Sequence, residues 1–152
     1  MANHLRRQIR DAVKTALTGL ATTGTRVYVG RSRPLARSHE PSLLIYTPQE
    51  ASRRAVNGQP PILDRIVQVI VEGRVSLAGE PDGTLDAIAK EVEAAMWTNR
   101  ALGGLVFNTR LVATDTSTEA DGERQLGGIR LSYEMTFQTP EGAADQNGNL
   151  VD

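Results

Sequence analysis

A run of alternating apolar and polar residues lies near the end of the chain, from residue 129 to residue 138. Apolar side chains occupy every second position: Ile129, Leu131, Tyr133, Met135 and Phe137. The long polar side chains between them are Arg130, Glu134 and Gln138. Successive residues of a β-strand point to opposite faces, so this run predicts a strand with one face in a core and one polar face.

Two other segments have the spacing of amphipathic helices. In residues 4–20, apolar side chains recur every three or four positions, the opposite face is basic, and Asn3 is the expected N-cap. The same spacing recurs in residues 84–97, where Thr84 or Asp82 can cap the start. Both segments are expected to bury one face against a sheet.

The remaining patterned segments are typical of strands, and they cover residues 26–30, 42–47, 62–75, 105–118 and 125–139. Pro41 and Pro48 bracket the second of these, and they are expected to end its pairing. Residues 48–60 have no periodic apolar face and are expected to form a long loop, a length typical of functional or disordered segments. The pair Gly127-Gly128 indicates a bulge in the last strand.

The order of these elements predicts an α+β fold, α-β-β-β-α-β-β. Two helices are expected to pack on one face of a mainly antiparallel or mixed sheet of about five strands. Its last two strands form a long hairpin with an acidic turn at residues 119–124. If the registers match, Ile66 and Ile70 join the polar residues of the last strand on the uncovered face. Residues 1–140 are expected to make a single domain, and the glycine-rich residues 141–152 a flexible C-terminal tail.

The chain of 152 residues carries no recognisable motif of catalysis. It has no cysteine, and His4 and His39 have no partner at the spacing of metal ligands. The sequence contains neither a nucleophile elbow nor a phosphate-binding glycine loop. We therefore expect no enzymatic activity, no metal and no cofactor. No apolar run approaches the roughly 20 residues of a membrane span, so no membrane partner is expected.

The net charge of −1 hides an uneven distribution of charge. Charged side chains in residues 1–40 are mostly basic, and those in residues 115–152 are mostly acidic. Opposite ends of this kind suit directional contacts between neighbouring copies of a chain. Scattered, solvated charge is the equally open alternative.

Two clusters of charged residues are candidates for binding a partner. The basic cluster comprises Arg31, Arg33, Arg37, Arg53 and Arg54. The turn at 119–124 contributes Glu119, Asp121, Glu123 and Arg124. Aromatic residues are too sparse for a nucleic-acid stacking platform, so only loose DNA contact or docking onto an acidic protein stays open for the basic cluster. The lone tryptophan, Trp97, is expected to anchor the core or an interface.

The order and spacing of elements over residues 3–140 resemble those of a known family. The features that carry the likeness are the helix Leu5–Val13, the segment Thr25–Arg31 with the proline-bearing loop after it, the segment Pro41–Pro48, the long strand Ile66–Val75, the mid-chain helix and the closing hairpin up to Thr139-Pro140. In this arrangement the chain resembles the tail terminator proteins of long-tailed bacteriophages, which are also described as minor tail or tail-completion proteins.

The resemblance implies a structural, non-enzymatic virion protein that is made in the host bacterial cytoplasm. Such proteins assemble as a ring, commonly a hexamer, on the head-proximal end of the tail tube. The ring ends polymerisation of the tube and presents the surface for head–tail joining, while DNA passes through its lumen without specific contact. The implied partners are further copies of the chain, the tail-tube protein and a neck or head-completion protein.

Loops between strands reach the tube protein in this family, which assigns docking roles to the charged clusters. By the resemblance, Arg53 and Arg54 in the 48–60 segment and the turn Glu119–Arg124 are the first docking candidates. The three arginines of the 31–37 segment come next. The polar side chains of the last strand, Arg130, Glu134 and Gln138, are expected to face the ring lumen or a neighbouring subunit.

Other functions stay open at this point. A head-closure or other neck protein of a phage has a similar size and character. A small ligand-binding or hydrolytic α+β domain would need a pocket with converging polar groups. A DNA-binding protein that used the basic helix would show a steep dependence of affinity on salt.

Overall fold

The computed structural model describes residues 2–30, 41–77, 79–122 and 124–148. The elements follow the predicted order, α-β-β-β-α-β-β, with one short 3-10 turn (η2, Leu102–Gly104) before the final hairpin. They are α1 (Leu5–Leu17), β1 (Val27–Val29), β2 (Ser42–Val56), β3 (Ile62–Leu77), α2 (Asp82–Thr98), β4 (Asn108–Asp121) and β5 (Arg124–Pro140). The predicted fold class is therefore confirmed.

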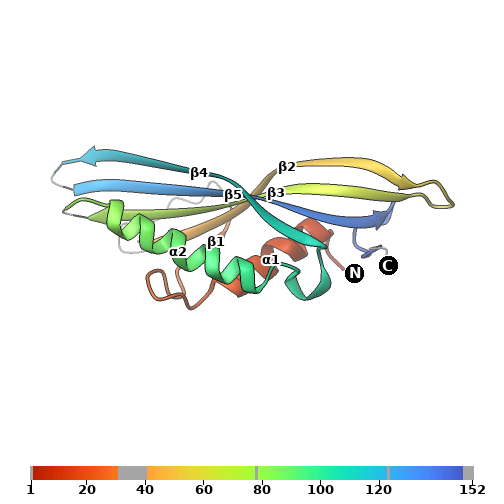
Figure 1. Cartoon of the computed structure of the whole chain (residues 1–152), viewed down its shortest axis with the longest axis horizontal. Coiled ribbons are helices and arrows are strands. Elements are labelled where there is room, and N and C mark those ends of the chain that lie inside the picture. Colours follow the sequence, from red (N-terminus) through yellow and green to blue (C-terminus); the bar gives the residue numbers. More distant parts are fainter. Residues whose placement is uncertain (1, 31–40, 78, 123, 149–152) are drawn as a thin grey trace.

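The five strands form a single mixed sheet in the order β1-β2-β3-β5-β4. The short β1 is parallel to β2, and all other pairs are antiparallel. The central strands β3 and β5 pair along their whole length, from Ile62 opposite Pro140 to Leu77 opposite Gln125. Figure 1 shows a long twisted sheet whose middle is covered on one face by α1 and α2, while hairpins project at its two ends. We call these the β2–β3 arm and the β4–β5 arm.

The core lies between the helices and the middle of the sheet. All five apolar residues of the alternating run in β5 are at most 3% exposed, as that pattern predicts. They pack with valines of β3 and with apolar side chains of both helices, which are Leu5, Ile9, Val13, Leu17, Leu85, Ile88, Val92 and Met96. Complete burial of one such side chain contributes roughly 1.5–3 kcal/mol, so this layer holds the helices on the sheet.

Both predicted helix starts need correction. The N-cap of α1 is His4 and not Asn3, because the His4 side chain accepts a hydrogen bond from the backbone N–H of Arg6 at 3.0 Å. The helix α2 begins at Asp82, so neither Thr84 nor Asp82 is its cap, and Pro81 in the cap position makes no side-chain hydrogen bond. Asp82 lies instead in the first turn, where a carboxylate complements the helix dipole.

The predicted loop at residues 48–60 is wrong for most of its length. Strand β2 continues past Pro48 to Val56 and pairs with β3, with shifts of register between Tyr46 and Gln49 and between Arg54 and Val56. The shift at Pro48 explains why a residue without an N–H does not end the strand, since bulges tolerate proline. From residue 51 onward both faces of the segment are exposed, so it carries no apolar alternation from which a strand is predicted.

The second hairpin also extends further than predicted. Strands β4 and β5 pair up to Asp121 opposite Arg124, so the acidic turn is shorter than residues 119–124. Gly122, with φ of 65°, occupies the left-handed region that this tight turn requires. The β4–β5 pairing is therefore regular almost to its tip, and β3 accompanies β5 as a third strand as far as Gln125.

The glycine pair in β5 makes no bulge. Gly127 and Gly128 pair in unbroken register with Thr118 and Ser117, and the irregularity of this hairpin lies between Leu111 and Ala113. A Cβ atom on Gly127 would lie 2.8 Å from Cβ of Pro81 and 2.9 Å from Cγ2 of Val75. The glycine therefore allows the start of α2 to approach the sheet closely, which is another reason for glycine in a strand.

Residues 141–148 follow β5 as a series of turns. The carbonyl of Ala144 accepts a hydrogen bond from the N–H of Leu5 at 2.8 Å, and the N–H of Gly148 donates to the carbonyl of Gln138 at 2.8 Å. The segment therefore runs beside the beginning of α1. The flexibility expected of residues 141–152 stays a prediction.

The close approach at Gly127 gives a prediction about stability. Gly127→Ala is expected to destabilise the fold by roughly 1–3 kcal/mol, because an overpacked methyl must displace Pro81 or Val75. Gly128→Ala is the matched control, since its one close contact would be the Ser117 hydroxyl, at 3.1 Å, and that side chain can rotate, while the Gly73 carbonyl at 3.8 Å is an ordinary contact. Urea denaturation measures both variants. Equal stability of the two would show that contact with α2 does not restrict position 127.

Candidate functional site

The sheet face turned away from the helices carries the polar positions of β5. Its register places Arg130 opposite Glu72 of β3 and Asp115 of β4. We call this surface the outer face. It includes Ile66 and Ile70 opposite Thr136 and Ser132, so the register expected for these two isoleucines is confirmed.

Ion pairs connect the strands across the outer face. Glu72 accepts from Arg130 at 3.2 Å and from Arg74 at 2.9 Å, and the hydrogen bond to Glu72 raises the pKa of Arg130. Arg110 lies 2.8 Å from Glu134. Gln138 is nearly buried and donates to the Asp64 carboxylate at 2.7 Å. Of the three predicted lumen or interface residues, Arg130 and Glu134 thus present partly exposed side chains, while Gln138 is held within the sheet.

The outer face also has an apolar hollow that the sequence does not predict. Ile66, Phe107 and Val112 are between 42% and 48% exposed, which is high for large apolar side chains. Ile66 and Phe107 line a hollow of about 280 Å³ together with Ala51, Asp64 and Thr136. Val112 lies at the bulge of β4, beside Ile66 in the neighbouring depression. Exposed apolar residues gathered in this way are typical of a surface that binds another protein.

The β2–β3 arm carries two of the predicted docking arginines. Arg53 and Arg54 lie on its strand β2 and have side chains that are 83% and 61% exposed. Arg53 lies 3.4 Å from Asp64, and Arg54 lies 3.1 Å from Glu141 of the C-terminal turns. Exposed ion pairs of this kind are worth less than about 1 kcal/mol, so both guanidinium groups can exchange their partners at little cost.

The β4–β5 arm carries the predicted acidic residues. Glu119 lies on its exposed strand β4, and Asp121 and Arg124 form the last backbone pair before the turn. Figure 1 places this arm at the opposite end of the sheet from the β2–β3 arm. The structure therefore separates the two docking candidates instead of bringing them together. Four predicted docking residues lie outside the described residues: Arg31, Arg33, Arg37 and Glu123.

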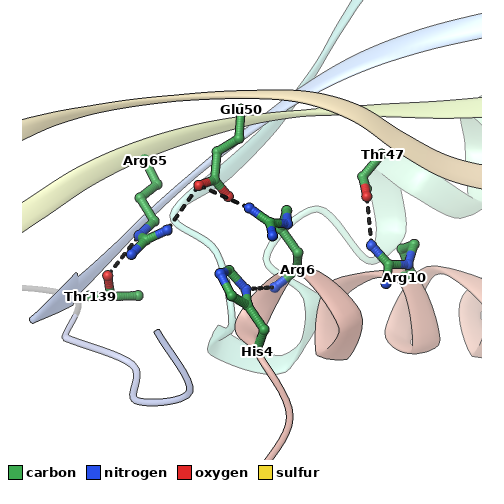
Figure 2. A network of polar contacts seen from close by, with 7 residues as sticks. All are labelled: His4, Arg6, Arg10, Thr47, Glu50, Arg65 and Thr139. Atoms are coloured by element: carbon green, nitrogen blue, oxygen red, sulfur yellow. Dashed lines mark hydrogen bonds and ion pairs between the residues drawn. The ribbon is translucent and has the colours of Figure 1, made fainter. Parts of the chain in front are cut away.

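A network of buried charge fixes the base of the β2–β3 arm to α1 (Figure 2). One carboxylate oxygen of Glu50 accepts from Arg65 at 2.8 Å and lies 3.3 Å from the Arg6 guanidinium. Arg65 also donates to the Thr139 hydroxyl at 2.7 Å. The side chains of Glu50 and Arg65 are about one tenth exposed, so the pair is nearly removed from water. The network joins four elements where the arm leaves the helix layer.

Two further contacts of α1 belong to this region (Figure 2). Burial, together with the positive charge of Arg6, lowers the pKa of His4 below its ordinary value. The lowered pKa favours the neutral ring, whose Nδ1 accepts the capping hydrogen bond from the backbone N–H of Arg6. Arg10 donates to the Thr47 hydroxyl at 2.6 Å, beside the bulge of β2. The first contact caps α1, and the second joins α1 to the strand that becomes the arm.

Trp97 does not lie in the core. Its side chain is 68% exposed, and the Arg100 guanidinium lies 4.6 Å from the centre of its ring. The neighbouring Tyr133 is buried beneath α2, and desolvation raises its pKa. Its hydroxyl has no hydrogen-bond partner among the described residues. The exposed indole is thus available for an interface, which was one of the two roles expected for it.

The described residues include no group of three or more His, Asp or Glu side chains that is arranged to hold a metal ion. The helices described here include none that is both long enough and apolar enough to cross a membrane. The features of the site are thus surfaces: an outer face with ion pairs and an apolar hollow, and two exposed arms of different charge.

Comparison with known proteins finds similarity among solved structures. No family model matches the chain. No curated protein matches it either. Among solved structures, the chain is similar to a chain of the "Virion of native gene transfer agent (GTA) particle", with 17% sequence identity and a TM-score of 0.41, over 90% of this chain and 92% of the other. At this identity and TM-score, the match says nothing about what the present chain does.

The buried network yields a prediction about the arm. Glu50→Ala is expected to lower the free energy of unfolding by about 3 kcal/mol, because it leaves the nearly buried Arg65 without its carboxylate. Glu134→Ala removes an exposed ion pair with the same N···O distance and is expected to cost less than about 1 kcal/mol. Thermal denaturation of both variants measures the difference. Similar losses would mean that the Glu50 network does not hold the arm.

Proposed function

We propose that this chain is a structural component of a bacteriophage or bacteriophage-like virion and that it acts as a tail terminator. In this role, copies of the chain form a ring on the head-proximal end of the tail tube. The ring ends polymerisation of the tube and offers a second surface to a neck protein. Its action is mechanical capping and requires no catalysis.

One observation carries the proposal: the outer strands of the two arms, β2 and β4, expose both faces over long stretches. Residues 51–56 of β2 and 112–120 of β4 are exposed throughout. A long open sheet of this type is an aggregation liability in a free monomer, and native proteins usually cover or blunt such edges. A permanent assembly would cover these surfaces. The choice of a tail-terminator ring as this assembly rests on the order of elements, which resembles that of tail terminators.

The charge and shape of the surfaces suit a cap with two different sides. The exposed arginines of the β2–β3 arm lie at one end of the molecule, and the acidic β4–β5 arm lies at the other. Complementary charge sets register and excludes wrong partners more than it adds affinity. The apolar hollow beside Ile66 and Phe107 adds the desolvated contact area that stable interfaces need.

A capping assay tests this function directly. Tail-tube protein encoded by the same genome is polymerised with and without the chain, and tube lengths are measured by electron microscopy. A terminator is expected to shorten the tubes and to appear as a ring on one end only. Rings at a portal or neck position in virions, with unchanged tubes, would indicate a head-closure protein instead. A chain that stays monomeric and does not bind tubes would contradict both assignments.

The β2–β3 arm provides a variant for this assay. Changing Arg53 and Arg54 together to glutamate is expected to abolish head–tail joining while leaving the fold intact, because both side chains are exposed and form only surface ion pairs. The control changes Arg7 and Lys14, exposed residues of α1, to glutamate and so introduces the same change in charge. Joining is scored by infectivity, and folding by circular dichroism. An unfolded arm variant, or equal loss in the control, would contradict the assignment.

A further inference from the structure

Apart from the short border strand β1, two stretches of strand edge are open among the residues that the structure describes. The strand β4 forms one border of the sheet and pairs only with β5. At the other border, β1 pairs with β2 only over Leu43–Ile45, so no described strand lies beside β2 from residue 47 onward. Unpaired strand edges offer backbone N–H and C=O groups to another strand.

The open edge of β4 has a regular stretch that can pair with another strand. After its irregularity between Leu111 and Ala113, it keeps regular register from Ala113 to Asp121. This stretch contains no proline and no lysine, which are common protections of an edge, and it is rich in threonine, a residue that favours strands. On β2, the regular stretch between the two register shifts is Gln49–Arg54. Each edge therefore offers a straight segment of strand length.

The direction of the strands makes the two edges compatible in neighbouring copies. Because β2, β3, β5 and β4 are successively antiparallel, β2 runs opposite to β4. The two open edges also lie on opposite borders and at opposite ends of the sheet (Figure 1). A second copy displaced along the sheet without rotation would place its β4 beside β2 of the first copy, in antiparallel orientation. Antiparallel pairing then continues one sheet into the next.

Charge favours this combination over pairing between like edges. Arg53 lies on the outer face of β2, and Asp115 and Glu119 lie on the outer face of β4. Cross-strand pairs of opposite charge stabilise a sheet, whereas like charges directly opposite each other destabilise it. Two copies of β4 would bring acidic residues together, and two copies of β2 would bring arginines together.

We propose that copies of this chain join by pairing the β2 edge of one copy with the β4 edge of the next, head to tail. This inference rests on the proposed function and specifies how the subunits of its ring meet. A contact between two different surfaces is heterologous, and it closes into a ring when each copy is also rotated relative to the last about a common axis. The strands of neighbouring subunits then form one continuous band of sheet.

Cysteine cross-linking tests the proposal, because the chain contains no natural cysteine. Ala51→Cys, on the outer face of β2, is combined in turn with Ala113→Cys, Asp115→Cys, Ser117→Cys or Glu119→Cys on the outer face of β4. Residues directly opposite each other in antiparallel strands bring their Cβ atoms to about 4.5–5.5 Å, close enough to form a disulfide after small adjustments. One combination is expected to give a ladder of covalent multimers on a non-reducing gel.

The control combines Ala51→Cys with Thr116→Cys, whose side chain points to the opposite face of β4. This control is expected to give no ladder, and the single-cysteine variants are expected to give none either. Light scattering of the unmodified chain is measured in parallel. An oligomer in which no outer-face pair cross-links would overturn the edge pairing and leave the proposed function standing.

Two other results would also overturn the proposal. Covalent dimers of the Ser117→Cys single variant would show that two β4 edges pair symmetrically. A strict monomer at all concentrations would contradict both the edge pairing and the proposed function. A ladder that ends at the mass found by light scattering would support a closed ring.

Discussion

The pairing of β3 with β5 is the constraint on which the rest of this structure depends. These two strands remain in register over their whole length, and every other element is positioned relative to them. Their shared apolar face holds both helices, with valines of β3 beside the alternating apolar residues of β5. The same pair that builds the core also carries the outer strands β2 and β4, whose exposed stretches belong to the two arms at the ends of the sheet (Figure 1).

The arms depend on backbone pairing and local anchors because they have no core of their own. At one end, the buried Glu50–Arg65 ion pair and its contacts with Arg6 and Thr139 fix the base of the β2–β3 arm (Figure 2). At the other end, Gly127 allows α2 to approach the base of the β4–β5 arm. Each arm has three strands, because β3 and β5 pair to both ends of the sheet, but its outer strand, β2 or β4, exposes both faces and one edge. An assembly of copies would cover these surfaces.

The sequence predicts those parts of the fold in which only one face of an element is buried. There the apolar residues recur with the period of a strand or a helix. The alternating run in β5 and the amphipathic spacing of α1 and α2 identify the core correctly. Where neither face of a strand is apolar, no such period exists, and residues 48–56 are therefore predicted as loop although they pair with β3. The outer-face hollow is only partly predictable: Ile66 follows from the register, whereas the exposure of Phe107 and Val112 depends on where β4 begins and bulges. The partner of Glu50 depends on contacts between distant segments, which no local pattern encodes.

The assembly of this chain into a ring through its open sheet edges is the central claim of the account. Cryo-electron microscopy of the purified oligomer, or of the virion that carries it, tests this claim most directly. The account predicts a closed ring in which β2 of each subunit lies antiparallel to β4 of the next, with the two arms sharing one continuous sheet. Isolated monomers, or a ring in which both edges face solvent, would contradict it.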